Sequence, residues 1–483
     1  RLNPDVDRVG WRVNALFADK FADDTLGIAL AATYLNEPFQ TEEFNAWGYG
    51  TLSVCNPNYS VVVASGGSDC GGGVQRVFSP AYEAAAGKFV IGGEKSYNTS
   101  SDLKRLALMG TLQFRPMSNF TSTLDVFYSN FKEDFIKRGI EVPLVFGEQS
   151  EFLLPNYTVE GDMITQGQFT NIDPVVRNDI FQRHAKLYAF GWNNEWRGDN
   201  GWRAFADISY SKTDRNELTF ESNSGTGRGL NNGVTDTIGF MSGNDGSSFT
   251  HVLDYSDYDL ILLTSPRGWG GTQNAADGTS ILNGQDGYYN DRIIDDKLWQ
   301  LRGEVGKDFD NSFLSGIQAG INYTKRSKDL VPDEFFVGIT ANTDGTVSIP
   351  VPEEFRRGTA DTFFGFGPMI AYDPLELLDA GVYKLVPNPF GDVVVKSYSI
   401  DERLITPYIQ ANIRGDLGAT ELTGNIGVQA IFTEQRSVGA SAVFLGTNPN
   451  GSPNVGAAVN DDKEDHVDVL PSLNLAFRMP SDF

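Results

Sequence analysis

The sequence predicts an all-β protein, a transmembrane antiparallel β-barrel with short periplasmic turns and long extracellular loops. Three observations predict this fold class. Eleven segments alternate apolar and polar residues with the period of two that a strand requires. Most of these segments run for about ten residues or more, which is the length that a strand tilted across a bilayer needs. Tight turns and long connections alternate along the chain, as they do in outer-membrane barrels.

The clearest hairpin spans Leu103–Phe131, where two long runs are joined by the short turn RPMSN. Each run has one apolar face and one face with hydroxyl and charged groups. The apolar faces carry Leu106, Leu108, Gly110, Leu112, Phe114, Leu124, Val126 and Tyr128, and the polar faces carry Arg105, Thr111, Gln113, Thr123, Asp125 and Ser129. A strand with lipid on one side and an aqueous lumen on the other needs this pattern.

Two further hairpins lie in the first half of the chain. One pairs Gly10–Phe17 with Leu26–Phe39 across ADKFADDT, and the other pairs Phe181–Trp196 with Trp202–Arg215 across RGDNG. Apolar side chains recur at every second position: Val13, Ala15 and Phe17; Leu26, Ile28, Leu30, Ala32 and Tyr34; Trp202, Ala204, Ala206, Ile208 and Tyr210. The strand Phe181–Trp196 is ambiguous, because its aromatic residues share a face with Lys186.

The second half of the chain repeats the pattern. Lys297–Gly306 pairs with Phe313–Lys325 across DFDNS, Asp401–Arg414 pairs with Thr420–Thr433 across GDLGA, and His466–Arg478 is the last strand. The alternating apolar residues are Trp299, Leu301, Gly303 and Val305; Ile317, Ala319, Ile321 and Tyr323; Leu422, Gly424, Ile426, Val428, Ala430 and Phe432; Leu473, Leu475 and Phe477. We interpret the lumen-facing charges as pairs that line the wall: Arg105, Asp125, Arg302, Glu304 and Arg414.

Long loops connect the hairpins at about residues 40–100, 132–176, 216–295, 328–400 and 434–463, with a short helix expected near Asp373–Ala380. Connections of this length are unusual in a compact soluble domain, but they are expected on the extracellular side of a barrel. The alternative is a soluble β-sandwich or an array of hairpin modules. That alternative explains the alternation, but it does not explain the strand length, the aromatic strand ends or the one-sided loops.

The composition excludes some classes of protein. The chain has 483 residues, a net charge of −25 and a sequence pI of about 4.5, which argues against binding to a nucleic-acid backbone. Apolar runs such as Val61–Ala64 are far too short to span a membrane as a helix. The mean hydropathy of −0.27 is compatible with a barrel, because lipid-facing and lumen-facing residues alternate and their average resembles a soluble protein.

Several segments resemble TonB-dependent outer-membrane receptors: RLALMGTLQFRPMSNFTSTLDVFYSNF, KFADDTLGIALAATY and DVLPSLNLAFR. The most similar subgroup is the large-looped one of Xanthomonas- and Caulobacter-like bacteria. The resemblance covers nearly all strands, and the loops only weakly. It implies a barrel of about 22 strands closed by an N-terminal plug. It also implies import of scarce ligands with energy from the TonB complex.

The sequence departs from that family in what it contains. We find no TonB box and no plug ahead of Arg1, and only about half of the expected strands, so the energy-coupling residues of the family cannot be assigned here. We therefore expect this stretch to be the middle of a longer receptor barrel, with the plug and the last strands outside it.

The two cysteines, Cys55 and Cys70, both lie in the first long loop. Because the outside of a cell is oxidising, we expect a disulfide, which restricts the unfolded loop by about 3 kcal/mol. Two free thiols are the alternative, and a metal site is disfavoured because no His is near in sequence.

Motifs for catalysis and for metal binding are not found. The three histidines, His184, His251 and His466, are scattered, and no nucleophile elbow or phosphate-binding loop occurs. We therefore predict that the protein is not an enzyme and has no cofactor. Acidic pieces at residues 244–259 and 291–296 have ligands of the type that Ca²⁺ prefers, but no EF-hand spacing, and a solvated acidic loop is the simpler reading.

Aromatic residues in the loops are candidates for ligand binding: Trp47, Tyr49, Trp269, Tyr288 and Tyr289. Aromatic faces stack on sugar rings or planar chelates, and neighbouring Asn and Asp side chains bond hydroxyl groups. The alternative is that these residues pack the loops together or belong to the interfacial aromatic belt. The sequence leaves both readings open.

We predict a receptor of the bacterial outer membrane that imports an oligosaccharide or a siderophore-like chelate without chemistry on the ligand. The expected partners are the TonB complex through a plug, outer-membrane lipid and the small-molecule ligand; no nucleic acid is expected, and a surface lipoprotein that caps the barrel is left open. Two alternatives share the strands: a passive porin-like channel, and a surface or adhesive barrel that transports nothing.

Overall fold

The computed structural model describes residues 3, 4, 6, 9–147, 151–310, 313–418, 420–449, 451 and 453–479. Arg1 and residues 480–483, on which the expectation of a longer chain depends, lie outside the described residues, as do parts of the predicted turns DFDNS (residues 311 and 312) and GDLGA (residue 419). The all-β fold class is confirmed, because strands dominate the described residues and the two α-helices are short.

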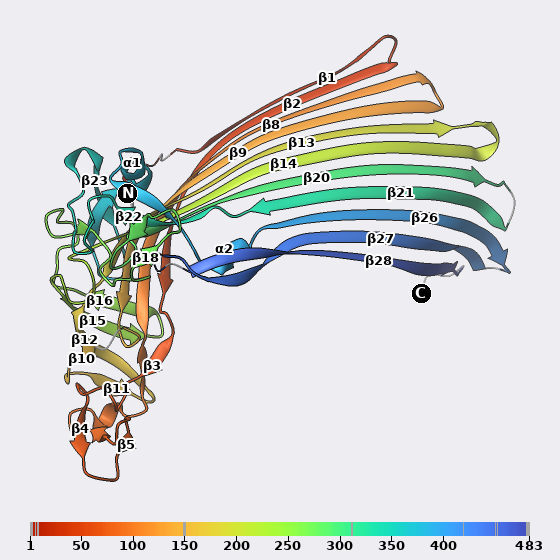
Figure 1. Cartoon of the computed structure of the whole chain (residues 1–483). Helices are drawn as coiled ribbons and strands as arrows, with labels where there is room; N and C mark the ends of the chain where they lie inside the picture. Colours follow the sequence, from red (N-terminus) through yellow and green to blue (C-terminus); the bar gives the residue numbers. More distant parts are fainter. Residues whose placement is uncertain are drawn as a thin grey trace.

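The largest element is an antiparallel sheet whose main path follows chain order, so that neighbours in sequence are neighbours in space (Figure 1). Its eleven strands are β1 (Trp11–Phe21), β2 (Leu26–Asn45), β8 (Gly93–Met117), β9 (Phe120–Pro143), β13 (Val175–Arg197), β14 (Trp202–Gly225), β20 (Gly287–Asp308), β21 (Leu314–Val331), β26 (Tyr398–Leu417), β27 (Thr420–Thr447) and β28 (Pro453–Arg478). Within the described residues, β1 pairs only with β2 and β28 only with β27.

Each predicted strand overlaps one of these eleven strands, but most of them continue into the predicted loops. Strand β8 begins ten residues before Leu103, and β9 continues to Pro143. The continuation was not apparent from the sequence because the alternation fails there. Ser96, Asn98 and Ser100 lie on the same side of β8 as its apolar residues, yet they are polar and buried under the loops.

The segment 434–463 differs most from expectation. It is a continued hairpin of β27 and β28, and only residues 448–452 connect the two strands. Cross-strand ion pairs replace apolar contacts here: Arg436 Nη2 lies 2.5 Å from Asp461 Oδ2, and Lys463 Nζ lies 2.8 Å from Glu434 Oε1. The charged side chains interrupt the apolar alternation, which is why this stretch resembled a loop.

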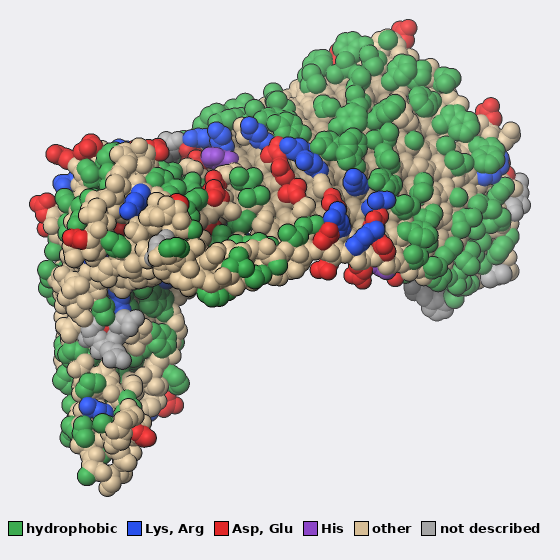
Figure 2. Space-filling model, viewed as in Figure 1, with side chains coloured by type: hydrophobic (Ala, Val, Ile, Leu, Met, Phe, Trp, Pro, Cys, Tyr) green, Lys and Arg blue, Asp and Glu red, His purple; other side chains and the backbone are tan. Residues whose placement is uncertain are grey.

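One face of the sheet is apolar, and we call it the apolar face. Residues directly opposite each other in paired strands point to the same side, so the register aligns the apolar positions from strand to strand. Ile208 lies between Trp192 of β13 and Leu301 of β20, and Leu301 lies opposite Tyr323 of β21. Many of these side chains are exposed, and Figure 2 shows them as a broad hydrophobic surface on the part of the sheet remote from the loops.

The opposite side of the sheet, the polar face, carries a network of side-chain hydrogen bonds. Thr111 Oγ1 donates to Asp125 Oδ1 at 2.5 Å, and Gln300 Nε2 donates to Asn322 Oδ1 at 3.3 Å. Tyr408 donates to Glu304, which also accepts from Arg203 at 3.1 Å. Neighbouring strands are therefore joined on this face through polar groups.

The described residues of 46–92, 144–174, 226–286 and 332–397 gather at one end of the sheet, and we call them the loop cluster (Figure 1). A second sheet within it consists of β3 (Tyr49–Thr51), β7 (Phe89–Ile91), β10 (Phe152–Leu153), β11 (Thr158–Glu160), β12 (Met163–Ile172), β15 (Asp236–Gly243) and β16 (Gly246–Thr250). Three short strands, β17 (Leu262–Leu263), β22 (Glu334–Ile339) and β25 (Tyr383–Pro387), join the large sheet.

The remaining elements of the loop cluster are small. They are β4 (Ser60–Val63), β5 (Ser68–Asp69), β6 (Gln75–Phe78), β18 (Gln273–Asn274), β19 (Ser280–Ile281), β23 (Arg356–Asp361), β24 (Pro368–Tyr372), α1 (Pro374–Asp379) and α2 (Gly391–Val394), with 3-10 turns at Glu83–Ala85 and Glu353–Phe355. A further 3-10 turn, Asp199–Gly201, lies outside the loop cluster, between β13 and β14. The predicted short helix is confirmed as α1, and its N-cap Asp373 accepts from the Leu375 N–H at 2.8 Å. In the described part of the chain, neither helix has the length and apolar character needed to cross a bilayer.

The buried core lies where the loop cluster covers the extended ends of the large strands. Ile140 of β9 and Phe220 of β14 pack there with Phe169, Tyr372 and Leu377, all of them buried. Hydrogen bonds also join the loop cluster to the large strands. Arg138 donates both to Asn178 at 2.9 Å and to the Tyr372 carbonyl at 3.1 Å. The loop cluster is therefore fixed on the sheet by its own hydrophobic core.

Candidate functional site

A cavity of about 640 Å³ lies at the loop-cluster end of the polar face. It is lined by β8, β9, β13 and β14, with Glu43 from β2 and Trp269 from the loop cluster. Along β13, Arg177, Asp179 and Arg183 are separated by even numbers of residues, so they project to the same side of the sheet. The cavity thus continues the polar face beyond the apolar band that lies on the other side.

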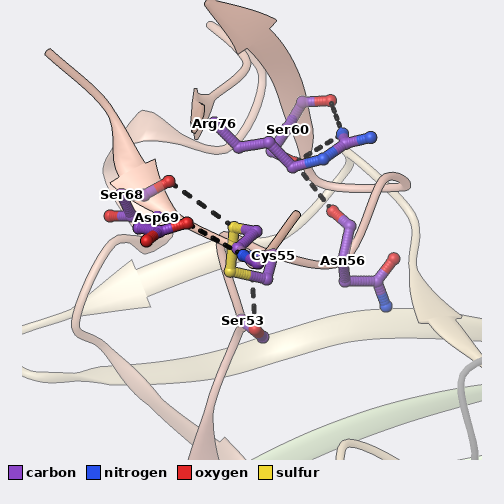
Figure 3. The surroundings of a disulfide bond; sticks show 9 residues. Ser53, Cys55, Asn56, Ser60, Ser68, Asp69 and Arg76 are labelled. Carbon is purple, nitrogen blue, oxygen red and sulfur yellow. Dashed lines mark hydrogen bonds between the residues drawn. A yellow bond between two sulfur atoms is a disulfide. The ribbon is translucent and has the colours of Figure 1, made fainter. Parts of the chain in front are cut away.

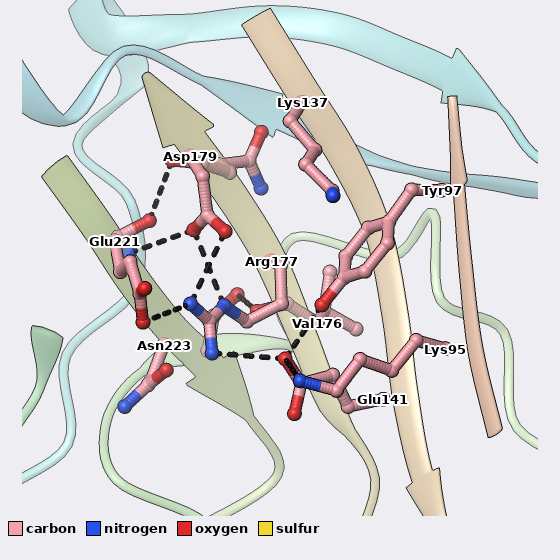
Figure 4. A network of polar contacts seen from close by, with 12 residues as sticks. Lys95, Tyr97, Lys137, Glu141, Val176, Arg177, Asp179, Glu221 and Asn223 are labelled. Atoms are coloured by element: carbon pink, nitrogen blue, oxygen red, sulfur yellow. Dashed lines mark hydrogen bonds and ion pairs between the residues drawn. The ribbon is translucent and has the colours of Figure 1, made fainter. Parts of the chain in front are cut away.

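Arg177 is the centre of a buried network in this cavity (Figure 4). Its guanidinium donates to both Asp179 oxygens, at 3.2 and 3.1 Å, to Glu141 at 3.1 Å and to Glu221 at 2.7 Å. Burial alone lowers the pKa of Arg177, but the surrounding carboxylates outweigh it and raise that pKa well above its ordinary value. The Arg177 side chain is 6% exposed. Its bonds to Glu141, Asp179 and Glu221 connect three strands, β9, β13 and β14.

The buried network shifts the pKa of Asp179. Burial raises the pKa of its carboxyl to about 6, although the charge of Arg177 and the N–H of Ser222 act in the opposite direction. The Ser222 N–H donates to Asp179 at 3.0 Å. Asp179 is therefore a group whose protonation changes near neutral pH, within a network that holds β13 to β14.

Tyr97 and two lysines complete the wall. Tyr97 Oη donates to Glu141 at 2.5 Å, and Lys95 Nζ lies 3.2 Å from the same carboxylate. Lys137 Nζ lies 4.4 Å from the centroid of the Tyr97 ring and bonds Glu43 at 2.7 Å. Partial burial works against ionisation of Glu43, but the bonds from Lys137 and Thr99 lower its pKa overall.

The charges of the cavity balance, in contrast to the acidic chain as a whole. Its lining has four acidic and four basic side chains: Glu43, Glu141, Asp179 and Glu221, and Lys95, Lys137, Arg177 and Arg183. Apolar surface comes from Trp269 and from Phe135 and Phe181, whose ring centroids are 5.5 Å apart. Such a cavity suits a ligand without net charge that has hydrogen-bonding groups and a flat apolar side.

Of the predicted aromatic residues, Trp269 and Trp47 lie at this cavity. Trp269 lines it directly, and positive φ angles at the neighbouring Gly268 (64°) and Gly270 (77°) form the sharp turn that carries it. Arg267 anchors this turn through a buried ion pair with Glu151. Trp47 lies beside the cavity, with its ring 5.7 Å from Lys95 Nζ.

The other three aromatic candidates lie elsewhere. Tyr49 is in β3, 48% exposed and outside the cavity lining. Tyr288 donates to Glu334, whereas Tyr289 packs on Phe220 with ring centroids 5.6 Å apart. Tyr288 and Tyr289 are adjacent in β20 and therefore point to opposite sides of the sheet.

Four residues of the cavity were not predicted from the sequence: Arg177, Glu141, Tyr97 and Lys137. Glu141 and Lys137 fell in a predicted loop, and so did Tyr97. A signal was nevertheless present in VVRNDIFQR, where Arg177, Asp179 and Arg183 continue the polar alternation of the predicted strand toward the loop. Following that alternation past Phe181 would have placed the charged side chains on one face.

Cys55 and Cys70 form a disulfide, with an S–S distance of 1.99 Å (Figure 3). The bond closes the segment that contains β4 and β5, at the tip of the loop cluster. Around it, the Cys55 N–H donates to Ser53 Oγ at 3.2 Å, and the Gly71 N–H donates to Asp69 at 2.9 Å. The disulfide therefore stabilises an exposed projection that is separate from the cavity lining.

The acidic segments that suggested Ca²⁺ do not converge. Asp254 accepts from Ser256, and Asp296 forms an ion pair with Arg326 at 2.6 Å. In the residues that the structure describes, no group of three or more His, Cys, Asp or Glu side chains has a geometry that could hold a metal ion.

The charges predicted to line the wall do have partners on the polar face. Arg105 donates to Ser129 at 3.0 Å, Arg302 lies 4.9 Å from the centroid of the Phe205 ring, and Arg414 lies 3.2 Å from Glu421. Asp125 and Glu304 accept the hydrogen bonds from Thr111 and Arg203 given above.

Comparison with known proteins adds no relative. No protein-family model, curated protein or solved structure matches the chain. The resemblance to TonB-dependent receptors stays a prediction.

Proposed function

We propose that the chain forms part of an outer-membrane β-barrel that takes up a small, uncharged, polar ligand, as in TonB-dependent receptors. The observation that carries this proposal is the contrast between the two faces of one sheet. Exposed apolar side chains cover one face over many strands, for example Leu301, Ile321, Ile409 and Leu473, each at least 40% exposed. A soluble protein rarely exposes so large an apolar surface to water.

The dimensions of the apolar face support a membrane location. From Trp202 to Tyr210 the apolar positions of β14 span eight residues, about 26 Å at about 3.3 Å per residue. With the tilt of about 35–45° that is usual for such strands, this length corresponds to a height of about 19–22 Å, close to the lipid-facing band of outer-membrane barrels, which is about 25 Å tall. Aromatic pairs mark its loop-side boundary: Trp11–Tyr34, Tyr128–Tyr188 and Tyr210–Trp299, with ring centroids 4.5 to 5.2 Å apart.

In this proposal the polar face lines the lumen, and its hydrogen-bond network is the wall. The loop cluster is extracellular, and the short turns face the periplasm. The cavity at Arg177 lies where the lumen meets the loop cluster, which is where an entering ligand first contacts the barrel wall. Energy coupling by the TonB complex, through a plug outside this sequence, belongs to the same proposal.

The charge balance of the cavity favours an oligosaccharide over an anionic chelate. An anionic ligand needs cations that are free to bind it, but Lys137 is already bonded to Glu43, and Arg177 to three carboxylates. A sugar brings hydroxyl groups for these charged side chains and a flat apolar side for Trp269. The ligand is bound and passed on, and no bond in it is broken.

Uptake by whole cells tests this function. Uptake of radiolabelled neutral oligosaccharides and of a ferric catecholate chelate is compared between the bacterium that expresses the full-length protein and a deletion strain that lacks it. We expect oligosaccharide uptake that needs the protein and stops when a protonophore removes the proton gradient. Trp269→Ala should raise the half-saturating concentration at least about tenfold, because a stacking contact is lost.

Tyr49→Ala is the matched control, since Tyr49 is an exposed loop aromatic outside the cavity lining. Uptake that persists with the protonophore would identify a passive channel instead. Binding to cells without uptake would identify a surface or adhesive barrel.

A further inference from the structure

A second concavity, of about 480 Å³, lies on the apolar face at the end nearest the loop cluster. Lys132, Lys186, Asp214, Ile293 and Asp295, from β9, β13, β14 and β20, line it, and we call it the rim site. Figure 2 shows a zone of basic and acidic side chains in this region, between the hydrophobic surface and the loop cluster. The rim site is on the opposite side of the sheet from the Arg177 cavity.

The register places the rim site directly beyond the aromatic boundary. Lys186 and Tyr188 are two residues apart in β13 and point to the same side, and Lys186 lies opposite Asp214 in β14. On β14 the order along this side is Tyr210, Lys212, Asp214. A charged layer thus follows the aromatic layer, in the order expected from hydrocarbon to headgroup.

The basic residues in and next to the rim site differ in whether they have partners. Lys212 is bound to Asp214 at 2.6 Å, and His184 to Asp134 at 3.0 Å. Lys132 and Lys186 are exposed, and neither forms an ion pair with another described residue. Asp214 and Asp295 face each other in register, with Lys212 and Lys297 beside them. Among the described lysines that line the rim site, Lys132 and Lys186 are therefore both without an ion pair, at the edge of an apolar surface.

We propose that the rim site binds the phosphate of an anionic lipid headgroup through Lys132 and Lys186. Phosphate is the anion that a bilayer presents at this depth, and two ammonium groups without partners are its natural ligands. The apolar face on the other side of the aromatic layer, which includes Leu301 and Ile208, then contacts the acyl chains. The inference rests on the proposed membrane location.

The experiment counts bound lipids on the full-length protein. The protein is placed in nanodiscs of phosphatidylcholine that contain one fifth phosphatidylglycerol or lipid A. It is then released from the nanodiscs in the mass spectrometer, and the lipids that it retains are identified. We expect retention of the phosphorylated lipid above its share of the bilayer. The double variant Lys132→Gln with Lys186→Gln should weaken this retention about tenfold or more.

Lys328→Gln is the matched control. Lys328 belongs to β21 at the same level. Ser327 lies opposite Lys297 and shares its side of the sheet, so the next residue, Lys328, points to the polar face. Inorganic phosphate at millimolar concentration should not displace the lipid, because it lacks the apolar part.

Three outcomes would overturn the inference. One is insertion into the bilayer with lipid retention equal to the bulk composition or unchanged in the double variant. Another is displacement by inorganic phosphate, which would make the rim site a simple anion site. Failure to enter the bilayer, measured separately by flotation of liposomes, would overturn the proposed membrane function together with this inference.

Discussion

Trp299 of β20 lies beside Tyr210 of β14, with the two ring centroids 4.5 Å apart. The next residues toward the loop cluster on the same side of these strands are Lys297 and Lys212, which are themselves opposite each other. In the other direction lie Leu301 and Ile208. This pair therefore marks the level at which the apolar face ends and a charged layer begins, as the membrane proposal requires.

A charge placed in the middle of the apolar face should impair insertion. Ala206 is exposed and lies midway between Trp202 and Tyr210. We expect Ala206→Arg to destabilise the inserted protein by about 2–4 kcal/mol, because an arginine at the bilayer midplane loses its hydration. Denaturant unfolding in liposomes measures this effect.

Ser209→Arg is the control for that experiment, since Ser209 points to the polar face of the same strand. It should change stability by less than about 1 kcal/mol. Equal effects of the two substitutions would argue that both faces meet water.

Removal of the Arg177 charge should destabilise the loop-side end of the sheet. In Arg177→Met, Glu141 and Asp179 remain buried without their cation, which costs about 3–5 kcal/mol for a buried pair. Arg183→Met, in the same strand but 40% exposed, should cost less than about 1 kcal/mol. Denaturant unfolding of the two variants side by side checks this, and similar losses would show that Arg177 is not the central cation.

Asp179 should make stability depend on pH in a known direction. Its pKa is about 6 in the folded protein against an ordinary value of 3.8, so the folded state holds this proton more tightly than the unfolded state. The contribution of Asp179 to the free energy of unfolding is then greatest below about pH 4 and declines as the pH rises to about 6. Asp179→Asn should remove this decline.

The measurement for Asp179 is the difference between wild type and Asp179→Asn in unfolding free energy from pH 4 to pH 7. Carboxyl groups with a lowered pKa, such as Glu43, make the free energy of unfolding change with pH in the opposite direction. Their contribution is the same in wild type and variant, so it cancels in that difference. A difference that does not change with pH would contradict the assignment.

Removal of the Cys55–Cys70 disulfide should destabilise the projection that it closes, and not the large sheet. The disulfide closes a segment of 15 residues, so Cys55→Ser with Cys70→Ser removes about 3 kcal/mol of constraint on the unfolded segment. Hydrogen exchange should accelerate in β4, β5 and β6, whereas the amides of β13 and β14 should keep their protection. Faster exchange throughout the large sheet would show that this projection supports the whole fold.

The strands were predictable because their register depends on a local pattern. In β20, for example, Trp299, Leu301 and Val305 alternate with Gln300, Arg302 and Glu304, and that period alone identifies a strand with two unlike faces. The pattern ends where the loop cluster covers the strands. Polar residues such as Asn98 and Arg138 are buried there as well as apolar ones, so polarity no longer alternates between the two faces. Strand ends and the long β27–β28 hairpin were therefore missed.

The cavity was less predictable than the strands. Arg177 meets Glu141 and Glu221 from positions 36 and 44 residues away, and only the register between β9, β13 and β14 brings them together. Aromatic composition pointed to Trp269, but it pointed equally to Tyr289, which packs in the core. The sequence indicates which side chains are suited to a ligand, and tertiary pairing decides which of them meet.

The most direct test of the central claim is to measure what each face of β20 contacts. Single cysteines at positions 299 to 305, in full-length protein that lacks Cys55 and Cys70, are spin-labelled after insertion into liposomes. Accessibility to oxygen, which concentrates in lipid, is compared with accessibility to a water-soluble nickel complex. We predict oxygen contact at Trp299, Leu301 and Val305 and nickel contact at Gln300, Arg302 and Glu304. Nickel access at every position would contradict the account and indicate a sheet with water on both faces.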